Sequence, residues 1–276
     1  MKKQLTYIPV GGLGNRMRGI ASAIHLAEKV EADLLIVWFK DQGLNCRFDE
    51  LFQPLVHENV DITLREAAFA DKVLMDRPRK KNLFIPCIFQ RIMFDSCLYE
   101  LDIDGLRANG FDFQDWASKA KKPYIASYSN FFPNNEKKRL AIFKPTDELQ
   151  ARIEEVCSSF DGNTIGLHIR RTDHTVAIAQ SPTELFDNAI LQFEGKNNFY
   201  LATDSEEEKQ HFKETFGDLI TTSPTKAVRS TTEGIKDAVV ELYVLSRTSR
   251  IIGSAQSTYS IAAAEISGIG YESMKQ

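Results

Sequence analysis

Short apolar runs alternate with amphipathic stretches along most of the chain. Continuous apolar runs of four to eight residues predict buried strands, and apolar residues at helical spacing predict helices packed against them. In the second half of the chain the two patterns alternate regularly. The pattern predicts strands at 164–170, 199–203, 218–222 and 250–254, and helices at 146–157, 181–193, 206–216, 233–246 and 259–266.

The first half begins in the same way. A short apolar strand at 5–10 is followed by a glycine-rich turn at 11–16, a helix with apolar residues at helical spacing, and a second strand at 33–39. This order is typical of a βαβ unit. Residues 40–125 show a weaker pattern, which predicts short helices at 48–52 and 64–69, a basic loop at 75–81, and strands at 83–89 and 124–128.

The length of the chain indicates two domains. Its 276 residues exceed the size at which one hydrophobic core usually stops growing. A polar, proline-containing stretch at 130–138 is the place where we expect the chain to pass from one domain to the other. The predicted domains are therefore 1–135 and 136–276, and the alternation of strands and helices makes both of the α/β class.

Composition and charge exclude several classes of function. The net charge is −4 with no basic tail, which argues against a nucleic-acid binder. The first ten residues are too short an apolar run for a signal peptide, and no run approaches the length of a membrane span. Four scattered cysteines predict reduced thiols in a cytoplasmic protein. We expect no metal, and we interpret Asp102 and Asp104 as part of a turn.

Polar clusters follow three of the predicted strands: His168–Asp173, Thr203–Ser205 and Ser254–Thr258. The carboxyl ends of parallel strands share one edge of a sheet, and open α/β sheets bind ligands there. Guanidinium groups bind phosphate oxygens in a bidentate manner, so Arg170 and Arg171 point to a phosphate. His168 and Arg170 share one face of the strand, whereas Arg171 faces the other way. The alternative is a surface strand end whose arginines pair with nearby acids.

Two further features fit an anionic ligand. Ser257 and Thr258 supply hydroxyl and backbone N–H groups at a helix start. The turn with Gly12 and Gly14 leads into a helix that begins near Asn15 and Arg16, although ordinary βα turns are also rich in glycine. Met17 stands where a dinucleotide fingerprint needs a small residue, and the turn lacks the Gly-Lys-Ser/Thr of a Walker A loop.

The motifs resemble those of one enzyme family. His168-Ile-Arg-Arg-Thr-Asp173 is similar to the His-x-Arg-Arg-x-Asp signature of GDP-fucose-dependent fucosyltransferases, which include α1,2- and α1,6-type enzymes and nodulation-factor fucosyltransferases. Phe199–Ser205 and the stretch 240–257 resemble the later motifs of that family in the same order, and Gly11–Arg16 resembles its opening turn. The resemblance covers 5–30 and 164–267.

The resemblance implies a GT-B-like fold, with two Rossmann-like domains facing across a cleft. It implies that the C-terminal domain binds GDP-fucose, that the N-terminal domain holds a glycan acceptor, and that transfer proceeds with inversion and without a metal or other cofactor. Arg170 would contact the pyrophosphate with Arg171 in support, and His168 and Glu241 would recognise the nucleotide. The expected catalytic residues are Arg170, Arg171 and Asp173. The expected donor-binding residues are Gly12, Gly14, Asn15, Arg16, His168, Arg170, Asp204, Ser205, Glu241, Ser257 and Thr258.

The sequence departs from the family pattern in three ways. Ser205 replaces an acid, Glu241 replaces aspartate, and residues 174–180 lack the acid that the α1,6-type enzymes carry there. The remaining candidates for a catalytic base are Asp173, His174 and Glu184. The expected function is fucose transfer from GDP-fucose to a glycan, in polysaccharide or oligosaccharide synthesis. The alternatives are a GT-B transferase for another nucleotide sugar and a nucleotide-sugar-binding protein without turnover.

Overall fold

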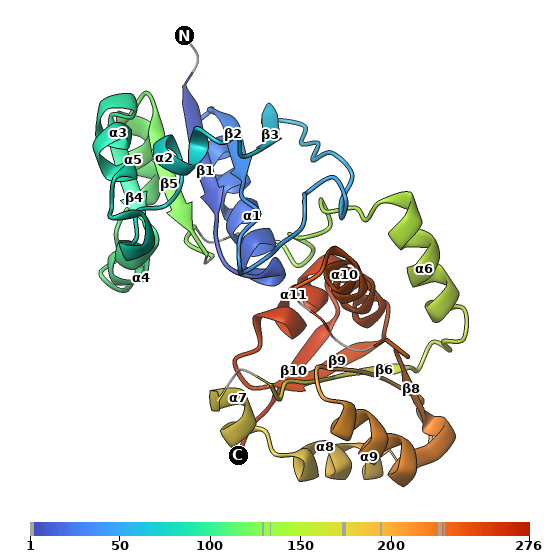
Figure 1. The fold of residues 1–276 in the computed structure, drawn as a ribbon. Coiled ribbons are helices and arrows are strands. Elements are labelled where there is room, and N and C mark those ends of the chain that lie inside the picture. The colour runs from blue at the N-terminus through green and yellow to red at the C-terminus, as the bar shows by residue number, and fades with distance from the viewer. Residues whose placement is uncertain are drawn as a thin grey trace. The chain divides into compact units, whose positions relative to one another are not determined.

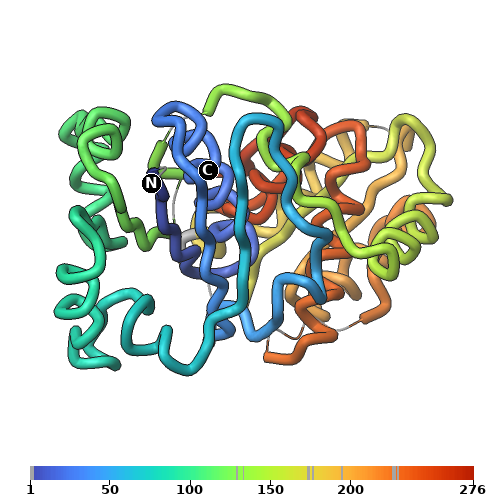
Figure 2. Tube along the Cα trace, turned by 90° about the horizontal axis from the view of Figure 1, so that it is seen from above, coloured from blue at the N-terminus to red at the C-terminus, as the bar shows by residue number. Residues whose placement is uncertain are grey.

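The computed structural model describes residues 3–276 except 129, 133, 173, 174, 194, 226, 227 and 229. The chain divides into two compact units, which we call unit 1 (Met1–Lys144) and unit 2 (Pro145–Gln276). Each unit is built on its own five-stranded parallel sheet. Both are α/β units, as the sequence predicts. In Figure 2 the trace of unit 1 runs from blue to green, and the trace of unit 2 runs from yellow-green to red.

The sheet of unit 1 has the strand order β3-β2-β1-β5-β4. Helix α1 packs on the face that carries Tyr7, because its Gly19 lies directly against the Tyr7 hydroxyl. The opposite face carries Ile8, which joins a core cluster with Val37 and Tyr124. The strands are β1 (Gln4–Pro9), β2 (Asp33–Trp38), β3 (Ile62–Glu66), β4 (Ser96–Tyr99) and β5 (Pro123–Ser127). The helices are α1 (Leu13–Lys29), α2 (Asp71–Leu74), α3 (Pro86–Met93), α4 (Glu100–Ala108) and α5 (Phe113–Lys119).

The sheet of unit 2 has the order β10-β9-β6-β7-β8, which is the order of a Rossmann-like domain. From β6 the chain first adds strands on one side and then returns to add β9 and β10 on the other. The point of reversal lies between β6 and β9. The strands are β6 (Ile165–Ile169), β7 (Phe199–Thr203), β8 (Ile220–Thr222), β9 (Arg250–Ser254) and β10 (Gly270–Met274).

Helices cover both faces of this sheet (Figure 1). One face carries α6, α10 and α11, of which α10 contacts both of the others. The other carries α8 and α9, whose Phe186 and Phe212 pack with Leu167 in a single core cluster. The helices are α6 (Asp147–Cys157), α7 (Thr175–Gln180), α8 (Thr183–Leu191), α9 (Glu206–Phe216), α10 (Thr232–Ser246) and α11 (Thr258–Ser267). Among the described residues, no helix is long and apolar enough to cross a membrane.

Several predictions for residues 40–125 are wrong. Residues 64–69 belong partly to β3, an edge strand whose pairing with β2 a local pattern cannot show. The strand predicted at 83–89 is replaced by α3, in which Pro86 occupies the first helical position. Residues 48–52 form a single turn that ends before Pro54. Asp102 and Asp104 lie in α4 and not in a turn.

Candidate functional site

The site is built where the chain order of the unit 2 sheet reverses, at the carboxyl ends of β6 and β9. The backbone N–H of Arg170, the first residue after β6, donates a hydrogen bond of 3.0 Å to the Oγ of Ser254 at the end of β9. Ser254 is fully buried. The first and third polar clusters of the sequence therefore meet, and they do so at the position where open α/β sheets bind ligands.

Asp204, at the end of β7, brings the second cluster to the same edge. Its Oδ1 accepts the backbone N–H of Arg171 at 2.8 Å, and its Oδ2 accepts the Thr172 hydroxyl at 2.8 Å. The Nη1 of Arg170 lies 3.1 Å from the same Oδ2. One carboxylate, on a side chain that is 10% exposed, thus orders the backbone of residues 171–172 and orients the Arg170 guanidinium.

The two arginines have different surroundings. Arg171 points toward α8 and α9, where its Nε donates to Glu208 at 2.6 Å and its Nη2 donates to the Thr183 hydroxyl at 3.1 Å. Arg170 lies on the other face of the strand, and its side chain is 21% exposed. Strand alternation predicts this separation. Arg171 therefore stabilises the strand end from within unit 2, whereas Arg170 lies partly exposed at the carboxyl-end edge of the sheet.

His168 is a neutral, buried member of the site. Its Nδ1 shares hydrogen bonds with the hydroxyls of Ser260 at 2.6 Å and Ser257 at 3.3 Å, and its ring packs on Tyr259. Burial, with the charge of Arg170 as a smaller cause, lowers the pKa of His168 to about 4. The imidazole is therefore uncharged at neutral pH, and its hydrogen bonds connect β6 to the start of α11.

Glu241 of α10 is the acid with the most perturbed ionisation in this region. Burial raises its pKa to about 7, the carboxylates of Asp237 and Asp204 add to the rise, and Lys209 opposes it. Among the described residues, no hydrogen bond or ion pair to its carboxylate is found. A carboxyl group with a raised pKa and no hydrogen-bond partner in the described part of the chain is suited to accept N–H donors from a ligand.

Helix α11 offers backbone donors beside Arg170. Ser257 is its N-cap, but the Ser257 side chain makes no capping bond and turns to His168 instead. The preceding Gln256 has a left-handed backbone with φ +56°, a conformation that non-glycine residues adopt at some cost. The first N–H groups of the helix, from Thr258 onward, lie at an end that favours anions.

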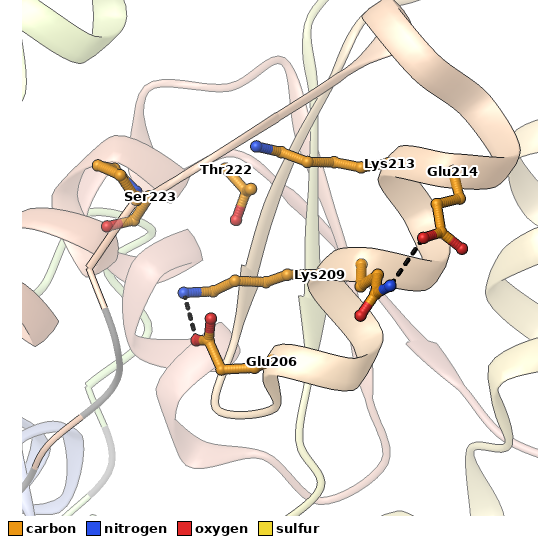
Figure 3. A pocket seen from close by; sticks show the side chains of 8 residues that line it. Glu206, Lys209, Lys213, Glu214, Thr222 and Ser223 are labelled. Carbon is orange, nitrogen blue, oxygen red and sulfur yellow. Dashed lines mark hydrogen bonds and ion pairs between the residues drawn. The ribbon is translucent and has the colours of Figure 1, made fainter.

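A pocket of about 500 Å³ opens farther along the same edge, between β8 and α9. Figure 3 shows Lys209 and Lys213 extending from α9 toward Thr222 and Ser223. Lys209 is buried and is held by Glu206 at 3.0 Å and by the Thr225 carbonyl at 2.6 Å. Lys209 also lowers the pKa of Glu241, so the charges of these two side chains interact.

The glycine turn belongs to unit 1. Gly12 is the N-cap of α1, Gly14 is buried in its first turn, and Asn15 is partly exposed. Arg16 is fully buried, and its three nitrogens donate to the carbonyls of Gly11 and Phe39 and to Asp41, at 2.7–2.8 Å. Arg16 therefore supports the turn from within the protein and is not exposed to a ligand.

The remaining predicted residues divide into three groups. Asp173 and His174 lie outside the described residues, Glu184 is exposed in the first turn of α8, and Ser205 caps α9 by accepting the N–H of Glu208 at 3.3 Å. Among the described residues, no group of three or more His, Cys, Asp or Glu side chains could hold a metal. Sequence reasoning missed Ser260, Glu208 and Lys209. Ser260 follows Ser257 by one helical turn, which was the available signal.

The solved structures that resemble this chain share one fold with it. The sequence matches no protein-family model and no curated protein. The α1,6-fucosyltransferase NodZ soaked with GDP-fucose is 19% identical, with a TM-score of 0.65 over 95% of this chain and 92% of that chain. The same fucosyltransferase from Bradyrhizobium is 18% identical, with a TM-score of 0.65 over 95% of this chain and 93% of that chain. A mutant of Arabidopsis thaliana FUT1 in complex with GDP is 16% identical, with a TM-score of 0.68 over 99% of this chain and 70% of that chain. The chain thus has the GT-B-like fold of these fucosyltransferases.

Proposed function

We propose that the protein is a glycosyltransferase that moves fucose from GDP-fucose to a glycan acceptor. The observation that carries the proposal is the position of Arg170, at the point of chain reversal between Ser254 and Asp204 and beside the start of α11. This arrangement offers a guanidinium and backbone N–H groups to a diphosphate. The fold shared with fucosyltransferases that were studied with GDP or GDP-fucose supports the choice of donor.

In the proposed reaction the acceptor hydroxyl attacks the anomeric carbon on the side opposite GDP. The bond between that carbon and the phosphate oxygen breaks, its electron pair leaves with GDP, and the configuration inverts. Arg170 and the N–H groups of α11 stabilise the negative charge that grows on the leaving phosphate more strongly than they stabilise the ground state. This clamp would replace a metal ion. The hydroxyl proton passes to a base, for which Asp173, His174 and Glu184 remain the candidates.

Glu241 is the proposed recognition residue for the base of the nucleotide. The edge of guanine presents neighbouring N–H donors, which suit a carboxylate that has no hydrogen-bond partner in the described part of the chain. His168 supports this function indirectly by fixing Ser257 and Ser260. Asp204 and Ser205 order the neighbouring strand end, and Thr258 presents the phosphate donors. Gly12, Gly14 and Asn15 remain predicted donor contacts.

The proposed division of labour follows the two halves of the chain. The C-terminal half, predicted from residue 136 onward, would bind the donor, and residues 1–135 would hold the acceptor. A cytoplasmic location is proposed because Cys46, Cys87, Cys97 and Cys157 are all free. A role in polysaccharide or oligosaccharide synthesis is the corresponding proposal for the pathway.

The test is thermal unfolding with nucleotides. GDP or GDP-fucose at about 100 times its Kd should stabilise the protein by roughly 2.7 kcal/mol and raise Tm by several degrees. Arg170→Ala should abolish this rise, because the guanidinium that meets the diphosphate is lost. Arg247→Ala is the matched control, since Arg247 is an exposed arginine of unit 2 at the end of α10, and it should keep the full response.

Two outcomes would contradict the proposal. If no guanine nucleotide raises Tm, GDP-fucose is excluded as the donor. A rise with GDP-fucose without release of GDP, in the presence of a panel of glycans, would favour a binding protein without turnover. A hydrolysis assay over several nucleotide sugars distinguishes fucose from other transferred sugars, because only the preferred donor should release its nucleotide at an appreciable rate.

A further inference from the structure

Helix α3 and the residues before it expose an apolar surface on unit 1. We call this surface the α3 apolar face. Leu83, Ile88 and Ile92 are 77%, 62% and 78% exposed. Contiguous exposed apolar patches are uncommon on soluble proteins and mark interaction sites. The complete set is Leu83, Phe84, Ile85, Ile88, Phe89, Ile92 and Met93.

The orientation of α3 is fixed by its one buried polar side chain. Gln90 is fully buried, and its Nε2 donates to the Asp76 carbonyl at 2.8 Å and to the Tyr124 hydroxyl at 3.2 Å. A rotation of the helix that buried Ile88 and Ile92 would expose Gln90 and break both bonds. The structure therefore specifies an α3 with its amide inward and its aliphatic residues outward.

The loop before α3 holds the apolar residues outward in the same way. Leu83 and Phe84 have left-handed backbones, with φ +51° and +57°, which are unfavourable for side chains of this size. The side chain of Asn82 stabilises this geometry by donating to the Arg77 carbonyl at 2.9 Å and to Asp76 at 3.2 Å, and by accepting the Arg79 N–H at 2.9 Å. Polar groups of the loop thus bond inward, while Leu83 and Phe84 face solvent.

The border of the face is basic. Lys80, Lys81 and Arg91 are exposed, and no hydrogen bond or ion pair to another described residue holds them. The carboxylates of this segment are already engaged, because Asp76 pairs with Arg79 and Asp95 accepts two backbone N–H groups. The side of unit 1 that carries α3, coloured teal in Figures 1 and 2, therefore combines apolar side chains with uncompensated positive charge.

We propose that the α3 apolar face docks into the surface of an anionic lipid bilayer. The apolar side chains would enter the boundary between headgroups and acyl chains, and Lys80, Lys81 and Arg91 would lie among the anionic headgroups. A second copy of the chain is a poorer occupant, because a symmetric contact through this face would bring the same cations together. All residues involved belong to unit 1, so the inference does not depend on the donor chemistry.

The experiment is sedimentation of the full chain with vesicles of two compositions. Vesicles that contain phosphatidylglycerol should retain the protein, and vesicles of phosphatidylcholine alone should retain little. The double variants Ile88→Ser with Ile92→Ser, and Lys80→Glu with Lys81→Glu, should each reduce binding to the anionic vesicles by about tenfold or more. High salt should weaken the binding of the unchanged protein, because its electrostatic part is screened.

Matched controls separate this surface from general charge and hydrophobicity. Leu191→Ser removes an apolar residue that is 63% exposed in unit 2, and Lys137→Glu with Lys138→Glu reverses another exposed lysine pair. Both controls should bind as the unchanged protein does, and circular dichroism should show every variant folded. The proposal is overturned if the protein does not bind anionic vesicles. It is also overturned if none of the α3 variants reduces that binding. A dimer in sedimentation velocity that the α3 variants dissociate would instead assign the face to a second copy.

Discussion

Arg170 and Arg171 are adjacent in sequence but have different physical tasks. Arg171 is enclosed by Glu208 and Thr183, so its charge is compensated inside unit 2. Arg170 is oriented by Asp204 at the open edge of the sheet. The separation follows from strand geometry, since consecutive side chains face opposite sides. Replacing Arg171 would therefore affect stability first, whereas replacing Arg170 would affect binding first.

Glu241 illustrates how burial changes the state of a single residue. Its raised pKa, about 7, means that the folded protein disfavours the ionised carboxylate. The contribution of this group to stability is therefore fully present below the pKa of an ordinary glutamate and is lost as the pH rises through 7. A buried acid whose ionisation is unfavourable is suited to a binding site. A ligand that donates hydrogen bonds to the carboxylate offsets part of the free-energy cost of ionising it.

Glu241→Gln should therefore stabilise the free protein in a pH-dependent manner. At pH 8 the variant should be more stable by on the order of 1–3 kcal/mol, and the difference should vanish near pH 4, where both side chains are neutral. Chemical unfolding across that range measures the effect. Glu233→Gln, at an exposed acid of the same helix, is the control and should show no such trend. A difference independent of pH would contradict this interpretation of Glu241.

At the scale of elements, the close packing of α11 on β9 determines the geometry of the site. A Cβ atom added at Gly253 would lie 2.6 Å from the Ser260 Oγ and 2.8 Å from the Ser260 Cβ. The same Ser260 bonds to His168 on β6. The absence of a side chain at one strand position thus allows the helix to approach the sheet and present its first N–H groups beside Arg170.

Gly253→Ala should disturb both stability and nucleotide binding. The added methyl group forces α11 away from β9, which should destabilise the protein by about 1–3 kcal/mol. It should also reduce the rise in Tm with GDP, because Ser257 and Thr258 move with the helix. Gly270→Ala is the matched control in the same sheet, since its nearest neighbouring atom would be 3.8 Å away. Equal behaviour of the two variants would show that this close approach is unimportant.

At the scale of the molecule, the chain consists of two parallel-sheet units with their own apolar cores. The polar strand ends that form the candidate donor site all belong to unit 2. The glycine turn, the buried Arg16 and the α3 apolar face all belong to unit 1. The proposed diphosphate site and the proposed membrane contact therefore reside in different units and can be tested separately.

Hydrogen exchange should localise the response to GDP within unit 2. At about 100 times its Kd, GDP should slow exchange by up to about 100-fold at amides that open only in the unbound protein. We expect the strongest effect at 168–172, 204–208 and 254–260, where backbone donors surround Arg170. Mass spectrometry of the Arg170→Ala variant provides the control and should show no such protection. Protection that avoids these three segments would argue against the site.

The sequence alone predicted four of the five strands of unit 2, missing only β10, together with the glycine turn and the convergence of three polar clusters. These features depend on local periodicity and on the common direction of parallel strands. Only the tertiary structure decided which partners the polar residues meet. Strand order brings Ser254 to Arg170, burial encloses Arg16, and helix packing sets the pKa of Glu241. The strand predicted at 83–89 was wrong for the same reason. Its apolar residues face outward because Gln90 fills the inner position of α3, and that contact with Tyr124 spans residues far apart in the chain.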